Sequence, residues 1–104
     1  METNETVLKE IDIMQIGGFK VGHAEDQEAG TGCTVLLFDK QSPAGVDVRG
    51  GGPASRETPL LNPVADCKEL HALLLSGGSA YALNAATGVM NYLEERGIGL
   101  PVGP

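Results

Sequence analysis

The sequence predicts a mixed fold of helices and strands, α/β or α+β, in which several strands and at least one helix share a single core. Two apolar runs of strand length, CTVLLFDK at 33–40 and LHALLL at 70–75, are typical of covered β-strands. From residue 79 onward the apolar positions recur at 3- and 4-residue spacing, which is typical of an amphipathic helix. A glycine turn separates the second strand run from this helix.

Length and composition are those of one globular domain. The chain has 104 residues, of which 41% are apolar, and 15 are glycine. A composition with so much glycine and only four Phe and Tyr residues favours close backbone packing over a core of large rings. We expect residues 1–10 to be a flexible N-terminus and residues 11–104 to belong to a single domain.

Charge and cysteine usage exclude several classes of partner. Fourteen acidic residues outnumber seven basic ones, and the absence of a basic stripe argues against binding nucleic acid or an anionic membrane. The N-terminus does not read as a signal peptide, and no apolar run reaches the length of a membrane span. Cys33 and Cys67 form no C-x-x-C pair, so we expect two reduced thiols and a cytoplasmic protein.

The segments between residues 19 and 70 predict short strands joined by loops. Val46 and Val48 alternate with polar residues in AGVDVRG, which predicts a strand at 44–50. The turn signal at 41–43 would join it to 33–40, so we expect these two strands to form an antiparallel hairpin. We also expect an extended piece at 19–23, an acidic loop at 24–32, an irregular loop at 50–63 and a short helix or turn at 64–70.

The helix should begin at Ser79, as its N-cap, and should end before Gly97 at the C′ position. A row of small residues along it would let another backbone come close. Its apolar face is predicted to consist of Ala82, Ala85, Ala86, Val89, Met90 and Leu93.

The turn Gly77-Gly78-Ser79 has three interpretations. It is close to the nucleophile elbow G-x-S-x-G, but Tyr81 takes the place of the second glycine, and no histidine follows Ser79. Backbone N–H groups at this helix start could instead hold an anion or an oxyanion. The plainest interpretation is a capped glycine turn that binds nothing.

The stretch Arg49-Gly50-Gly51 is the second candidate for a pocket or a structural turn, because glycines after a strand permit close approach to a ligand or another chain. A flexible loop is the alternative. Arg56 and Glu57 predict a solvated pair. No His, Cys, Asp and Glu cluster has the spacing of a metal site, so no metal or cofactor is expected.

The two histidines predict no catalytic role. We expect His23, beside the acidic loop, to be a surface residue. His71 lies in an apolar strand run and is expected to be a packed, hydrogen-bonded core residue.

Four motifs in order resemble one enzyme family. They are VDVRGG, RET, LSGGSA and GVMNYLEERG, within a match over about residues 16–103. Together they resemble the N-terminal part of the DmpA-type, self-processing serine aminopeptidases, the S58 or P1 family, which includes L-aminopeptidase/D-esterases and β-aminopeptidases. The ornithine acetyltransferase group resembles these segments less well.

The resemblance implies both a fold and an activity. Family members form an αββα sandwich, cleave their own backbone so that a serine becomes a new N-terminus, and release N-terminal residues from peptides, amides or esters. The nucleophile and the other recognised catalytic groups of the family lie beyond the matched segment. The resemblance therefore implies no catalytic residue here, and a structural or pocket-lining role for Arg49, Gly50, Gly51, Gly77, Gly78 and Ser79.

On this interpretation residues 11–104 are an incomplete N-terminal portion of one αββα domain, inactive alone. The expected partners are the remainder of its own precursor, small substrates and further copies in a homo-oligomer. Two alternatives stay open, a classical serine hydrolase that uses Ser79 and a non-catalytic module that binds a ligand or a subunit.

Overall fold

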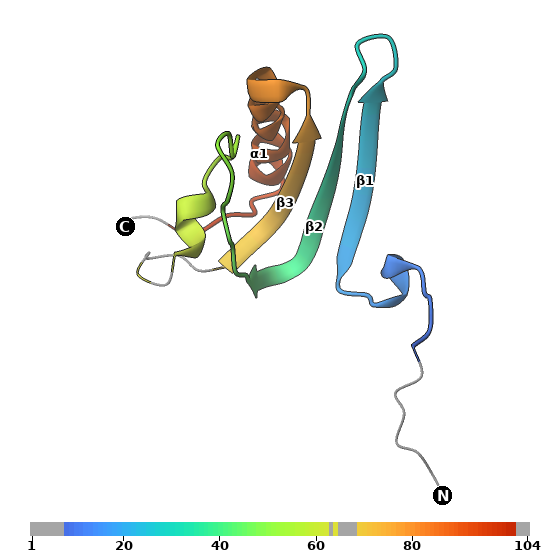
Figure 1. Cartoon of the computed structure of the whole chain (residues 1–104). Helices are drawn as coiled ribbons and strands as arrows, with labels where there is room; N and C mark the ends of the chain where they lie inside the picture. The colour runs from blue at the N-terminus through green and yellow to red at the C-terminus, as the bar shows by residue number, and fades with distance from the viewer. Residues whose placement is uncertain (1–7, 63, 65–68, 102–104) are drawn as a thin grey trace, which may run out of the picture.

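The computed structural model describes residues 8–62, 64 and 69–101, and it contains a three-stranded antiparallel sheet with one α-helix (Figure 1). The strand order is β1-β2-β3, so β2 is central. The fold class is therefore α+β, as predicted. The elements are η1 (Ile13–Gln15), β1 (Phe19–Asp26), β2 (Thr31–Pro43), η2 (Thr58–Leu61), β3 (Glu69–Gly77), η3 (Ser79–Asn84) and α1 (Ala85–Glu95), where η marks a 3-10 helix.

The first hairpin joins β1 to β2, and the predicted hairpin between 33–40 and 44–50 is wrong. The register runs from Phe19 opposite Phe38 to Asp26 opposite Thr31. Residues 27–30 make the turn, where Oδ1 of Asp26 accepts a hydrogen bond from the Ala29 amide at 3.1 Å. Gly30 completes the turn with a φ of +68°, which glycine adopts without steric cost.

The strand β2 continues through the expected turn at 41–43. After an irregularity in the register it pairs with β3 again, Ser42 opposite Leu70 and Pro43 opposite Glu69. Residues 44–49 form no strand, although their valines alternate with polar residues. The second partner of β2 is thus a strand more than 25 positions away, because an apolar strand gains more by pairing with another apolar strand than with a polar neighbour.

The start of the helix differs from the prediction. Ser79 is not an N-cap but the first residue of η3, and Gly78 precedes it with a φ of +144°. Ser79 itself has a φ of +63°, a left-handed conformation that is uncommon for a residue with a side chain. The regular α-helix begins only at Ala85, after almost two turns of tighter helix.

The end of the helix agrees with the prediction, because Gly97 occupies the C′ position with a φ of +66°. Its amide donates to the Glu94 carbonyl at 3.0 Å, and the Ile98 amide donates to the Leu93 carbonyl at 2.9 Å. This pair of bonds is a Schellman motif, which satisfies carbonyls that the helix leaves unpaired.

The predicted apolar face of the helix is confirmed. Met90 is 55% exposed, and the other members of that face are half-buried. Arg56 reaches this face from the loop before η2, with its guanidinium 3.5 Å from the Leu83 carbonyl oxygen and 3.8 Å from the sulfur of Met90. The expected pair of Arg56 with Glu57 is therefore wrong, since the arginine contacts the helix.

The sheet has a helix face and an open face. Strand alternation places Ala72, Leu74 and Ser76 on one side of β3, and the Ser76 hydroxyl donates to the Ala82 carbonyl of η3 at 3.0 Å. This side, against η3 and α1, is the helix face (Figure 1). Leu73 and Leu75 lie on the opposite side, the open face, with 40% and 59% of their surface exposed.

Packing is correspondingly thin. No described side chain is fully buried, and His71, which we expected in a core, is half-buried on β3. Cys33 is a free thiol on β2, whereas Cys67 lies outside the described residues. No helix in the described part of the chain is long and apolar enough to cross a membrane.

Candidate functional site

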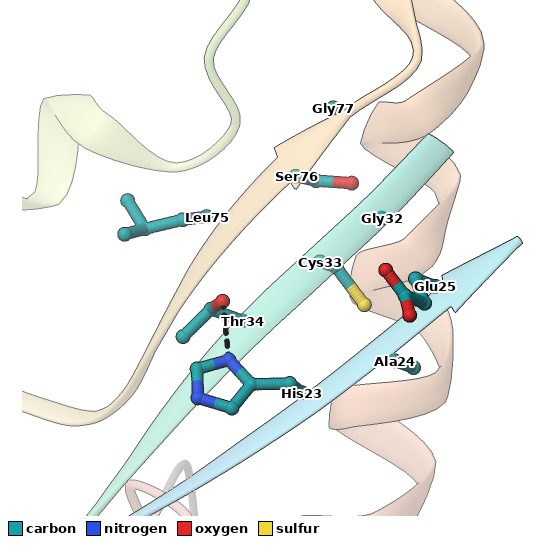
Figure 2. Close-up of a pocket in the computed structure, with 9 residues that line it drawn as sticks. All are labelled: His23, Ala24, Glu25, Gly32, Cys33, Thr34, Leu75, Ser76 and Gly77. Carbon is teal, nitrogen blue, oxygen red and sulfur yellow. Dashed lines mark hydrogen bonds between the residues drawn. The ribbon is translucent and has the colours of Figure 1, made fainter. Parts of the chain in front are cut away.

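A hollow of about 600 Å³ lies at the end of the sheet where β1 turns into β2 and β3 ends. Figure 2 shows His23, Thr34 and Leu75 pointing away from the helix, whereas Ser76 points towards the side on which the helix lies. No residue of η3 or α1 lines this hollow, which places it on the open face. Its lining residues are His23, Ala24, Glu25, Gly32, Cys33, Thr34, Leu75, Ser76 and Gly77.

An oriented imidazole forms one wall of this hollow. His23 and Thr34 are directly opposite in the β1–β2 register, and Nδ1 of His23 lies 2.7 Å from Oγ1 of Thr34 (Figure 2). This hydrogen bond fixes the ring orientation and leaves Nε2 for another partner. The histidine is exposed, as predicted, and the extended piece expected at 19–23 is the first part of β1.

The floor of the hollow consists of two glycines on neighbouring strands. Gly32 is opposite Glu25 on one side and Gly77 on the other. A Cβ atom on Gly77 would lie 3.6 Å from the Gly32 carbonyl oxygen, an ordinary contact, so the space above Gly77 can hold another group. Two adjacent positions without side chains therefore create the depression beside the Glu25 carboxylate.

A second hollow of about 470 Å³ adjoins the first on the helix face and includes Gly77, Gly78 and Tyr81 in its lining. Gly78 is tightly surrounded, because a Cβ atom there would lie 3.1 Å from Cβ of Ala82 and 3.2 Å from Cγ2 of Thr31. Tyr81 is 92% exposed, so its ring stands out from this turn.

Among the described residues, Ser79 does not have the surroundings of a nucleophile. Its positive φ resembles the strained backbone of a nucleophile elbow. An activated serine also needs a base within hydrogen-bond reach, and within the described residues the Ser79 hydroxyl has no hydrogen-bond partner. His23, the exposed histidine, is paired with Thr34 instead.

The structure does not bring the second candidate segment to either hollow. Arg49 lies in the exposed stretch after β2, where Nε donates to Oδ2 of Asp47 at 2.8 Å. This pair is solvated, with 85% and 69% of the side chains exposed. Gly50 and Gly51 have no atom within 4 Å of the position of an added Cβ. Their pocket-lining role stays a prediction.

Sequence reasoning identified Gly77 and Gly78 but missed Glu25, His23 and Thr34 as a group. The sequence predicts a loop at 24–32 where the structure has the adjoining ends of β1 and β2, so it pairs neither Glu25 with Gly32 nor His23 with Thr34. The missed signal is the spacing of Asp26 and Gly30, which is typical of a tight turn between two strands. Among the described residues, no three His, Cys, Asp or Glu side chains gather as a metal site would require.

Comparison with known proteins gives a consistent assignment. The model of peptidase family S58 matches residues 12–101. An uncharacterized aminopeptidase of Mycobacterium bovis is 45% identical over 101 residues, which cover 88% of this chain and 29% of the relative. An uncharacterized aminopeptidase of Mycobacterium leprae is 45% identical over 91 residues, covering 80% of this chain and 25% of the relative.

A 6-aminohexanoate-oligomer endohydrolase of Kocuria is 37% identical over 79 residues, covering 76% of this chain and 20% of the relative. The chain thus spans less than a third of the length of these relatives. The family match extends over all of the described strands and helices. The chain belongs to peptidase family S58.

Proposed function

We propose that this chain is the N-terminal part of a self-cleaving serine aminopeptidase, which removes N-terminal residues from peptides, amides or esters. The observation that carries the proposal is the family match over residues 12–101 together with relatives named aminopeptidases. In this proposal the nucleophilic serine becomes the N-terminus of a second chain and uses its own α-amine in place of a separate base.

The chain described above contributes a scaffold and part of a pocket, not the nucleophile. Ser79 lacks a base among the described residues, which supports a nucleophile elsewhere in the longer protein. The turn at Gly78 holds η3 against the end of the sheet, and the two hollows meet at Gly77. The proposal includes association with the remainder of its precursor and assembly of the complete enzyme into a homo-oligomer.

The test uses the longest natural gene product that contains this sequence. Intact-mass measurement after expression should find two chains from one precursor, and the purified protein should hydrolyse L-alanine p-nitroanilide. Ser79→Ala should leave both the cleavage and the turnover unchanged. A single uncut chain that is active, and inactive after Ser79→Ala, would replace this proposal with a classical serine hydrolase.

Residues 1–104 alone should show no turnover on the same substrate. A protein that remains uncut and inactive at full length, yet folds, would favour the non-catalytic module. A parallel assay uses 6-aminohexanoate oligomers. It distinguishes an exopeptidase, which would prefer the p-nitroanilide, from the endohydrolase activity for which the Kocuria relative is named.

A further inference from the structure

The hollow on the open face combines one carboxylate, one oriented imidazole and a floor without side chains. A Cβ atom on Gly32 would lie 3.6 Å from Cβ of Glu25, so the bare glycine floor begins directly beside the glutamate. Gly77 extends that floor to β3, where Leu75 supplies an apolar wall. A small group can therefore rest on the sheet backbone between the carboxylate and an apolar surface.

The electrostatics of this hollow favour a cation. Oε1 of Glu25 accepts one hydrogen bond, from Nε2 of Gln27 at 3.2 Å, and within the described part of the chain Glu25 forms no ion pair. Asp26 and Glu28 do not line this hollow, so Glu25 is the carboxylate among its lining residues. A carboxylate in this position is a strong acceptor for the N–H groups of an ammonium ion.

The imidazole supplies a second directed contact. With Nδ1 held at Thr34, Nε2 of His23 is left as the ring atom able to contact a ligand. His23 and Glu25 are two positions apart on β1, so strand alternation places both side chains on the open face. Figure 2 shows both side chains pointing to the same side of β1.

We propose that this hollow binds the free primary ammonium group of the substrate. Glu25 is the ionic partner of the ammonium, and His23 makes the second polar contact. The side chain of the first substrate residue lies over Gly32 and Gly77 against Leu75. This inference rests on the proposed aminopeptidase function, because such an enzyme acts on substrates with a free amino terminus.

The first test uses saturation-transfer difference NMR, which observes the ligand. It is made on the chain with Leu73→Lys, a change outside the lining of the hollow that opposes association through the open face. L-Alaninamide should give a saturable signal, and N-acetyl-L-alaninamide, which lacks the charge, should not. Glu25→Gln should raise the Kd of L-alaninamide about 1.5-fold to fivefold, as expected for loss of one exposed ion pair. Tetramethylammonium, a cation without N–H donors, should bind more weakly.

A second variant fills the floor without touching the carboxylate. Gly77→Val places its Cβ at an ordinary contact distance, and its φ is not left-handed, so the strand should be kept. The matched control is Gly45→Val, where no atom lies within 4 Å of an added Cβ, outside the hollow. Gly77→Val should abolish the L-alaninamide signal, and Gly45→Val should leave it unchanged.

Several results would refute the proposed binding site. These are equal affinity for the free and acetylated amides, equal affinity for tetramethylammonium and L-alaninamide, or unchanged affinity in both Glu25→Gln and Gly77→Val.

Experiments on the longest gene product distinguish failure of this site from failure of the proposed function. Turnover with the KM of L-alanine p-nitroanilide unchanged by Glu25→Gln refutes the site alone. Ammonium binding without any peptidase turnover refutes the proposed function and leaves the binding site standing.

Discussion

The helix face and the open face of the sheet carry similar side chains but have different surroundings. On β3, Leu74 faces the helix and is half-buried, whereas its neighbour Leu75 on the open face is 59% exposed. Both strand runs are apolar enough to be covered on both sides. An apolar strand pattern therefore indicates that a strand needs to be buried on both faces. Whether each face is buried depends on which other elements pack against it.

The largest expected effect concerns the turn that holds the helix face together. Gly78→Val combines a strained positive φ with contacts below 3.4 Å to Ala82 and Thr31, and should cost about 2–5 kcal/mol of stability. Circular dichroism should then detect no cooperative thermal melt. Gly88→Ala is the control, since no neighbouring group lies within 4 Å of a Cβ added at Gly88 and alanine should stabilise the helix by about 1 kcal/mol. A normal melt for Gly78→Val would show that η3 does not need this turn.

The two leucines test the faces directly. Leu74→Ala should destabilise the chain by about 1–3 kcal/mol, because it removes contacts with the helix. Leu75→Ala should cost less than about 0.5 kcal/mol, as expected for an exposed position. Urea unfolding of the two variants measures both values. Equal losses would mean that the open face is covered in solution.

The open face should also make the chain associate. Exposed apolar surface and two sheet edges with which no described strand pairs invite self-association, so size-exclusion chromatography of residues 1–104 should find species larger than a monomer. The double change of Leu73 and Leu75 to Lys should shift the elution towards the monomer without loss of the α-helical signal. A wild-type chain that elutes as a monomer with a sharp melt would contradict this difference between the two faces.

The smallest effect is expected at Ser79. With no cap hydrogen bond to lose, Ser79→Ala should change stability by less than about 0.5 kcal/mol. Ser79→Gly should instead stabilise by up to about 1 kcal/mol, because glycine adopts a φ of +63° without strain. Differential scanning calorimetry distinguishes the two. A loss of about 1 kcal/mol or more in Ser79→Ala would restore the capping role that the sequence suggested.

The sequence was sufficient to predict the elements that depend on residues close together in the chain. The strand runs at 33–40 and 70–75, the apolar face of the helix and the Gly97 stop are all present in the structure. Each depends on residue periodicity or on a turn conformation that only nearby residues determine. The fold class follows from the same signals.

Strand pairing was not predictable in the same way. The alternation of Val46 and Val48 favoured a local partner for β2, but β2 pairs with β1 and β3. Partner choice depends on burial and on cross-strand contacts, which a single segment does not reveal. The candidate site was not predictable for the same reason, because only the β1–β2 register places His23 opposite Thr34 and Glu25 opposite Gly32. The αββα sandwich and the pocket role of Arg49 stay predictions.

The central position of β2 has a consequence for hydrogen exchange. In an antiparallel sheet the amides of a central strand point alternately to its two neighbours. The Asp39 amide donates to the Gly18 carbonyl at 3.0 Å, on the β1 side, so the amides of Val35 and Leu37 face β1, and those of Thr34 and Leu36 face β3. Release of either edge strand exposes every second amide of β2. Exchange rates along β2 should therefore fall into two interleaved sets, and the faster set would identify the strand that detaches first.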